Sequence, residues 1–138
     1  MRIFWLPGAF FLLNEFFNRA VNLYEHFPWV DIPMHTVGGV IIAYSMEVFF
    51  DICRQKKYIG KLHPALHVLF LTALVGTIAV LWEFHEFIRD TFFREHTQPS
   101  VPDTMLDLFL GLLGGFITSS ILVLQKKRNF FWDRVFLR

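Results

Sequence analysis

The chain has 138 residues, of which 54% are hydrophobic and 18% are charged, and its formal net charge is +1. An average soluble domain carries about 25% charged residues, so this composition is typical of a membrane protein. The small net charge, without a basic cluster interleaved with aromatic residues, excludes the usual features of a nucleic-acid-binding protein. Cys53 is the only cysteine, which excludes a disulfide framework and a zinc site built from cysteines.

The first predicted helix covers about residues 3–25 and combines an apolar sequence with a polar stripe. Asn14, Asn18 and Asn22 are spaced four residues apart, which places them on one face of a helix. We expect either a spanning helix whose stripe faces the bundle or an amphipathic helix lying in the membrane interface. The length of the segment favours the spanning alternative.

Three further segments are long and apolar enough to cross a bilayer, which requires about 20 residues. We expect helices at about residues 31–53, 65–90 and 103–127, separated by the basic loop RQKKYIGKLHP and by the polar loop TFFREHTQPSVP. The sequence therefore predicts one all-α domain. It is an integral membrane bundle of four helices, or of three helices plus one interfacial helix.

The distribution of Lys and Arg predicts the orientation, because cytoplasmic segments retain more positive charge. Four basic residues lie between positions 54 and 61, and five more lie between positions 126 and 138. The opposite side receives only Arg89 and Arg94, with Arg19 inside the first helix. We therefore expect a multi-pass protein with both termini in the cytoplasm.

Acidic side chains gather at the helix ends on the side opposite the basic loop. The sequence DIPMH begins the second helix, WEFHEFIRD ends the third, and DTMLD begins the fourth. Within each cluster the acids and the first histidine are three or four residues apart, so they share one helical face. Eight acids lie on this side: Glu25, Asp31, Glu83, Glu86, Asp90, Glu95, Asp103 and Asp107.

Carboxylates crowded near a low-dielectric core must become protonated, pair with arginine or bind a cation. Oxygen ligands with one imidazole suit a divalent cation such as Mg²⁺, Mn²⁺, Fe²⁺ or Zn²⁺. We expect Glu86 to act also as a catalytic general base on a metal-bound water. His85 lies off this helical face, so we expect an interfacial residue there. The predicted metal ligands are Asp31, His35, Glu83, Glu86, Asp103 and Asp107.

Structural roles are alternatives for several of the acids. Asp31 and Asp103 each begin a predicted helix and are candidates for N-caps that accept backbone N–H bonds. Arg89 and Asp90 are candidates for an exposed ion pair of small energetic value. The deeper positions favour a polar function, because an unpaired charge inside the membrane is expensive.

Two other features favour structural roles. Glu47 and Asp51 lie near the opposite end of the second helix, where His67 or the lysines of the basic loop are expected to neutralise them. Glycines follow the two helix starts that begin with Asp, and small residues of this kind let helices approach closely. These glycines are Gly38, Gly39, Gly111, Gly114 and Gly115.

The order of three motifs resembles a known family. D-x-x-x-H, then W-E-F-x-E, then D-T-x-x-D followed by a Gly-rich helix is similar to the YjdF-like small inner-membrane proteins and, more distantly, to the VanZ-like proteins linked to glycopeptide resistance. The likeness covers roughly residues 30–124. It implies a location in the inner (cytoplasmic) membrane, and it points to the predicted ligands together with Thr104.

Three classes of function agree with these patterns. The first is a metal-dependent membrane enzyme that acts on a lipid or a lipid-linked envelope intermediate at the outer leaflet. The second is a cation- or proton-coupled binding or transport protein, in which the acids form part of a pathway. The third is a structural membrane subunit. The expected partners are membrane lipids and not nucleic acid, and the sequence leaves assembly into a homo-oligomer open.

Overall fold

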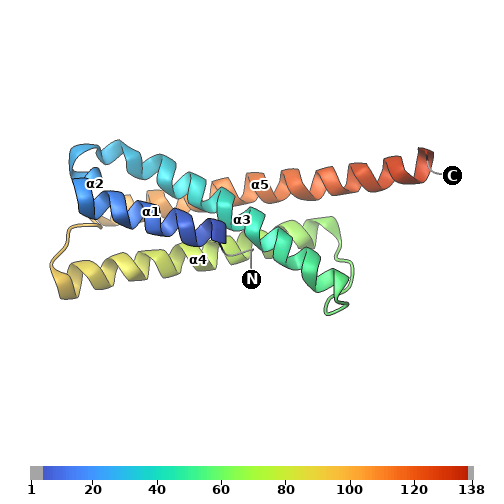
Figure 1. Ribbon diagram of the computed structural model, residues 1–138, viewed down its shortest axis with the longest axis horizontal. Coiled ribbons are helices and arrows are strands. Elements are labelled where there is room, and N and C mark those ends of the chain that lie inside the picture. The colour runs from blue at the N-terminus through green and yellow to red at the C-terminus, as the bar shows by residue number, and fades with distance from the viewer. Residues whose placement is uncertain (1–4, 137–138) are drawn as a thin grey trace.

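A computed structural model describes the backbone of residues 5–136 and the side chains of residues 5–126. This part of the chain is all-helical and has no strand, which confirms the predicted all-α class (Figure 1). The elements in chain order are α1 (Trp5–Val21), α2 (Leu23–His26), the short 3-10 helix η2 (Pro28–Val30), α3 (Asp31–Gln55), α4 (Pro64–Phe93) and α5 (Val101–Phe136).

Three helical segments of the described chain are long and apolar enough to cross a membrane. They cover Pro28–Gln55, Pro64–Phe93 and Val101–Lys126. Large apolar side chains stay exposed on these helices, as expected where the surroundings are lipid; Leu69, for example, is 61% exposed. The described part of α1 has 17 residues and measures about 26 Å at 1.5 Å per residue, against a hydrocarbon core of about 30 Å. Within the described residues, three helices are therefore candidates to span the membrane.

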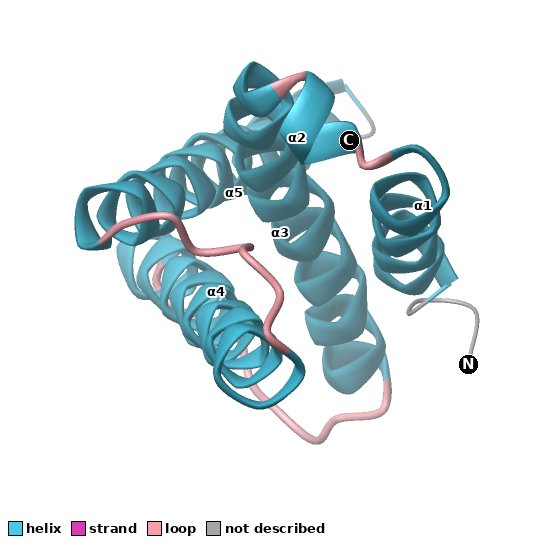
Figure 2. Cartoon of the chain, turned by 90° about the vertical axis from the view of Figure 1, so that its left-hand side faces the viewer, coloured by secondary structure: helices cyan, strands magenta, loops and turns pink. Residues whose placement is uncertain are grey.

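The predicted helix over residues 3–25 is interrupted, which corrects its expected extent. Asn22 has φ 48° and ψ 53°, in the left-handed region, so α1 ends at Val21 and the short α2 begins at Leu23. Asparagine tolerates this conformation better than most residues, because its short polar side chain can bond locally. The break turns the chain across the end of the bundle, between α1 and α3 (Figure 2).

The backbones of α3 and α5 touch at their glycines, and this helix pair shares the most extensive contact in the fold. A Cβ atom on Gly39 would lie 2.1 Å from the carbonyl oxygen of Gly111, and a Cβ on Gly114 would lie 2.4 Å from that of Thr36. No side chain fits at these distances, so glycine is required at both positions. A Cβ atom added to Gly38 or Gly111 would make only ordinary van der Waals contacts.

Three helix termini meet at one end of the bundle, which we call the acidic end. Here α3 and α5 begin and α4 ends, and α1 runs beside α3 toward the same end (Figures 1 and 2). A loop of seven residues, 94–100, joins α4 to α5 there. Side chains that are far apart in the sequence are therefore brought together at this end.

An ion network ties the three long helices together at the opposite end. His67 Nε2 lies 2.7 Å from Glu47 Oε2, and Arg54 Nη2 lies 3.1 Å from Glu47 Oε1 and 2.5 Å from Asp51 Oδ1. Lys126 of α5 contacts both carboxylates. His67, one of the expected partners, pairs with Glu47. The other cations of the network are Arg54 of α3 and Lys126 of α5.

Candidate metal site at the acidic end

The first group of predicted ligands joins the starts of α3 and α5. His35 Nε2 lies 3.2 Å from Asp31 Oδ1, one helical turn earlier on α3, and 3.8 Å from Asp107 Oδ1 of α5. Asp31 and His35 share a face because they are four residues apart. The close approach of the two helices at their glycines brings Asp107 to the same place.

A second group adds the end of α4. Glu83 and Glu86 are three residues apart on its buried face, and each offers a carboxylate oxygen close to the same imidazole of His35. In each group of three, the candidate ligand atoms all lie within 4.8 Å of one another. Ligand atoms around a single ion with bonds of about 2.1 Å are about 3 to 4.2 Å apart, so small side-chain movements would close either group around a cation.

Asp103 lies outside both groups, although it lines the same polar cavity as Asp31 and Glu86. Neither Asp31 nor Asp103 is the N-cap of its helix, which was the alternative structural role for each. Val30 occupies the N-cap of α3 and makes no side-chain cap bond. At the start of α5 the Ser100 hydroxyl accepts a hydrogen bond from the backbone N–H of Asp103 at 3.3 Å, so Ser100 is the residue that caps this helix.

Two neighbours orient the glutamates: Gln98, which lies outside the motifs, and Trp82, the first residue of the W-E-F-x-E motif. The side-chain amide of Gln98 donates to Glu83 Oε2 at 2.8 Å and to the Glu83 carbonyl oxygen at 3.1 Å. The indole N–H of Trp82 donates to Glu86 Oε1 at 2.9 Å. Polar groups that bond to ligands in this way fix their orientation and raise metal affinity. Gln98 belongs to the α4–α5 loop, where helical periodicity gives no signal.

Arg89 and Asp90 do not form the exposed ion pair that was considered as their structural role. Arg89 is only 6% exposed, and its guanidinium donates to Glu15 Oε1 of α1 at 2.6 Å and through Nε to Glu95 Oε2 at 2.7 Å. Asp90 accepts bonds from the backbone N–H groups of Thr97 and Gln98. Both residues therefore hold other segments in place at the acidic end.

Within the described side chains, the deepest carboxylates of the site have no Lys or Arg partner. Glu83, Glu86 and Asp107 are 6%, 8% and 3% exposed. Among residues 5–126 none of the three forms an ion pair with Lys or Arg, and Arg89 is engaged elsewhere. Buried negative charge of this kind requires a proton or a cation.

A polar cavity of ≈ 660 Å³ opens beside the site. Asp31, Glu86 and Asp103 line it together with the predicted polar stripe of Asn14, Asn18 and Asn22. The stripe of the first helical segment therefore faces this cavity. The glutamate predicted as a general base is reachable from it.

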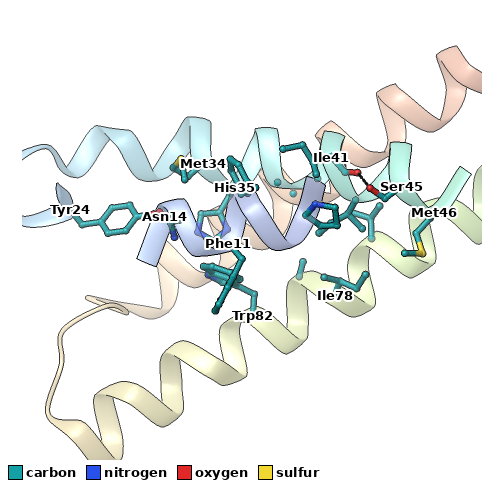
Figure 3. Close-up of a pocket in the computed structure, with 18 residues that line it drawn as sticks. Phe11, Asn14, Tyr24, Met34, His35, Ile41, Ser45, Met46, Ile78 and Trp82 are labelled. Atoms are coloured by element: carbon teal, nitrogen blue, oxygen red, sulfur yellow. Dashed lines mark hydrogen bonds between the residues drawn. The ribbon is translucent and has the colours of Figure 1, made fainter. Parts of the chain in front are cut away.

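His85 stays apart from both groups of ligands. Its ring packs against Phe11 and Trp82, with ring centroids 5.9 and 5.7 Å apart, and its buried Nδ1 finds no hydrogen-bond partner within the described residues. The ring of His35 is also near Trp82, with the two ring planes perpendicular and their centroids 6.5 Å apart (Figure 3). Only one of the two histidines near Trp82 is placed to serve as a ligand.

Comparisons with known proteins place the chain among membrane proteins. The profile of the family described as "Predicted membrane protein (DUF2238)" matches residues 4–128. An uncharacterized protein of Thermotoga maritima is 31% identical over 122 residues, which are 87% of this chain and 61% of that relative, so the chain spans about three-fifths of the relative's length. No solved structure matches the chain. The resemblance to YjdF-like and VanZ-like proteins stays a prediction.

Proposed function

Because the chain belongs to the DUF2238 family of predicted membrane proteins, we propose that it is a multi-pass membrane protein that binds a divalent cation at the acidic end. The observation that carries this proposal is the group of buried carboxylates, Glu83, Glu86 and Asp107, which pair with no Lys or Arg among residues 5–126 and lie close to the imidazole of His35. A dication compensates several carboxylates at once, whereas each proton compensates only one. Carboxylate oxygens with one imidazole are suitable ligands for Mg²⁺, Mn²⁺, Fe²⁺ or Zn²⁺.

The cation would serve a reaction at the membrane interface. A metal ion lowers the pKa of a bound water and polarises phosphoryl or carbonyl oxygens. Glu86 lines the polar cavity and belongs to one candidate ligand group, so it is placed to accept a proton from such a water. In the proposed topology the site, near the starts of α3 and α5 and toward the end of α4, would lie close to the lipid head groups. These features support a metal-dependent enzyme that acts on a lipid or a lipid-linked envelope substrate.

The proposed location is the inner (cytoplasmic) membrane, with both termini in the cytoplasm and the acidic end facing outward. The support is the distribution of basic residues in the sequence: nine lie at positions 54–61 and 126–138, which the predicted topology assigns to the side opposite the acidic clusters. Positively charged segments are retained in the cytoplasm. In this orientation the substrate would reach the site from the outer leaflet.

Cation- or proton-coupled transport is the second candidate, favoured by the ion network at the other end of the bundle. Glu47 and His67 form a buried pair there, so titratable groups occupy both ends of α3. His35 and Glu47 are 12 residues apart on this helix, or about 18 Å. Apolar residues such as Ala43 and Val75 separate the two ends, which favours the enzyme over the pathway.

Thermal unfolding of the purified protein with and without a chelator tests the proposed cation site. A ligand that binds only the folded state adds about 2.7 kcal/mol at a hundredfold excess over its Kd, so chelation should lower Tm. Glu83→Gln and Asp107→Asn each remove an anionic ligand with little change of shape, and both should abolish most of the chelator effect. Asp51→Asn, in the opposite ion network, is the control and should keep it.

The outcome that contradicts the cation site is equally definite. If chelator leaves the Tm of the unsubstituted protein unchanged, the buried carboxylates are protonated and the transport or structural function takes precedence. If Asp51→Asn abolishes the chelator effect as fully as Asp107→Asn does, the cation binds elsewhere.

A further inference from the structure

An apolar cavity of ≈ 280 Å³ lies between α1, α3 and α4, next to the site. Figure 3 shows the side chains around it, from Tyr24 and Asn14 near the acidic end to Met46 farther along α3. Its walls are almost wholly hydrocarbon and aromatic. They include Phe10, Phe11, Ile42, Met46, Ile78 and Trp82.

The apolar cavity and the polar cavity meet at one pair of side chains. Asn14 and Tyr24 line both cavities, and the Tyr24 hydroxyl donates to Asn14 Oδ1 at 2.5 Å. Burial raises the pKa of the Tyr24 phenol, so the group stays protonated and remains a donor. A ligand that occupied both cavities would cross from an apolar to a polar environment at this pair.

The polar cavity is acidic: six carboxyl side chains and two arginines line it, and three carboxyl side chains remain beside the two arginines when the predicted metal ligands are left out. Both of its arginines already pair with acids: Arg19 Nε lies 3.4 Å from Glu15, and Arg89 bonds Glu15 and Glu95. A dication at the metal site would still leave the cavity with more acids than cations. The carboxyl side chains that line it are Glu15, Glu25, Asp31, Glu86, Glu95 and Asp103.

We propose that the two cavities together bind one membrane amphiphile, with part of an acyl chain in the apolar cavity and a positively charged amine of its head group in the polar cavity. The amine follows from charge complementarity with the acidic lining, and the chain follows from the hydrocarbon walls. This inference deepens the proposed function by naming the substrate class. It rests on that function for the reaction, and binding itself requires no metal.

The cavity volumes agree with one chain and one head group. A dry apolar cavity of about 150 Å³ holds a benzene molecule, so ≈ 280 Å³ accommodates roughly a dozen carbon atoms by the same measure. That space suits part of a single chain and excludes two chains side by side. The polar cavity of ≈ 660 Å³ lies within the range of about 300–1,000 Å³ that is usual for small-molecule sites.

Native mass spectrometry of the delipidated protein, titrated with single-chain lipids in the presence of a chelator, tests the proposal. The probes are lysophosphatidylethanolamine, which carries an amine, and lysophosphatidylglycerol with the same acyl chain. We expect a one-to-one adduct and at least tenfold tighter binding of the amine lipid. Glu25→Gln should reduce this preference, because Glu25 lines the polar cavity and lies outside both ligand groups.

A cavity-filling substitution tests the acyl site. Ile78→Trp places a large side chain in the apolar cavity and should weaken binding of the amine lipid at least tenfold. Leu69→Trp is the matched control on the exposed surface of the same helix and should bind normally. A photoreactive group at the end of the acyl chain, used on the unsubstituted protein, should label Phe10, Phe11 or Met46.

Two results would overturn the proposal. One is equal affinity for the amine and glycerol head groups, and the other is photolabelling confined to exposed residues such as Leu69 and Phe109; either means adsorption to the outer surface of the helices. Because the titration is done in chelator, loss of the metal site leaves these measurements unchanged. A failure of the cation proposal and a failure of the lipid proposal are therefore distinguishable.

Discussion

At the scale of single residues, the position of Glu83 depends on Gln98. The Gln98 amide bonds both the side-chain and the main-chain oxygen of Glu83, while Asp90 accepts a bond from the Gln98 backbone N–H at 2.9 Å. Asp90 therefore fixes the backbone of the α4–α5 loop at Gln98, and the Gln98 side chain fixes the Glu83 carboxylate. Gln98 is thus a positioning residue for the proposed cation.

We predict that Gln98→Ala weakens cation binding about 10- to 100-fold, the usual effect of removing a group that orients a metal ligand. Competition with a fluorescent chelator of known affinity measures the change. Gln55→Ala, at the exposed end of α3, is the control and should leave the affinity unchanged. Equal affinities for the Gln98→Ala and Gln55→Ala proteins would show that Gln98 does not position a ligand.

Arg89 provides a second prediction at this scale, concerning stability. Arg89→Gln leaves Glu15 and Glu95 without their buried partner and should destabilise the fold by about 3 kcal/mol, as removal of one member of a buried ion pair does. Arg19→Gln removes a guanidinium whose side chain is 69% exposed and should cost about 0–1 kcal/mol. Reversible denaturation in detergent measures both changes, and equal losses would contradict a buried network.

At the scale of helices, the α3–α5 contact sets the geometry of the site. Gly39→Ala would place a Cβ 2.1 Å from the Gly111 carbonyl oxygen, so the helices must separate. Overpacking of this kind costs about 1–3 kcal/mol, and the separation moves Asp107 away from His35. We predict lower Tm and weaker cation binding for Gly39→Ala, measured together.

Gly8→Ala is the matched control for that substitution. Gly8 lies in α1, and a Cβ atom added there would meet no heavy atom within 4 Å, so alanine should be tolerated and should favour the helix. If Gly39→Ala behaves like Gly8→Ala in both measurements, the close backbone contact does not position the metal ligands.

The helices and much of the site follow from periodicity and hydropathy. Asp31 and His35, or Glu83 and Glu86, share a face because of their spacing, and alternating crossings place their helix ends on one side. The partners of Arg89 do not follow, since they depend on how α1 packs and how the α4–α5 loop folds. The break at Asn22 could not be predicted from the four-residue spacing of the asparagines either, because that spacing in the sequence is the same whether or not the backbone at Asn22 is helical.

At the scale of the whole molecule, the orientation of the bundle decides which leaflet supplies a substrate. In a Cys53→Ser background, Lys56→Cys should be protected from a membrane-impermeant maleimide in intact cells, and His96→Cys should react. Both positions are exposed loop residues, so permeabilised cells should label both. Labelling of Lys56→Cys with protection of His96→Cys in intact cells would reverse the proposed orientation.

The most direct test of the proposed cation site is the metal content of the whole purified protein. Inductively coupled plasma mass spectrometry, after gel filtration in metal-free buffer, should find close to one divalent cation per chain in the unsubstituted protein, since both candidate groups share His35. The Asp107→Asn protein should contain far less, and the Asp51→Asn protein should match the unsubstituted one. A metal content near zero in the unsubstituted, folded protein would contradict a resident cation at the acidic end.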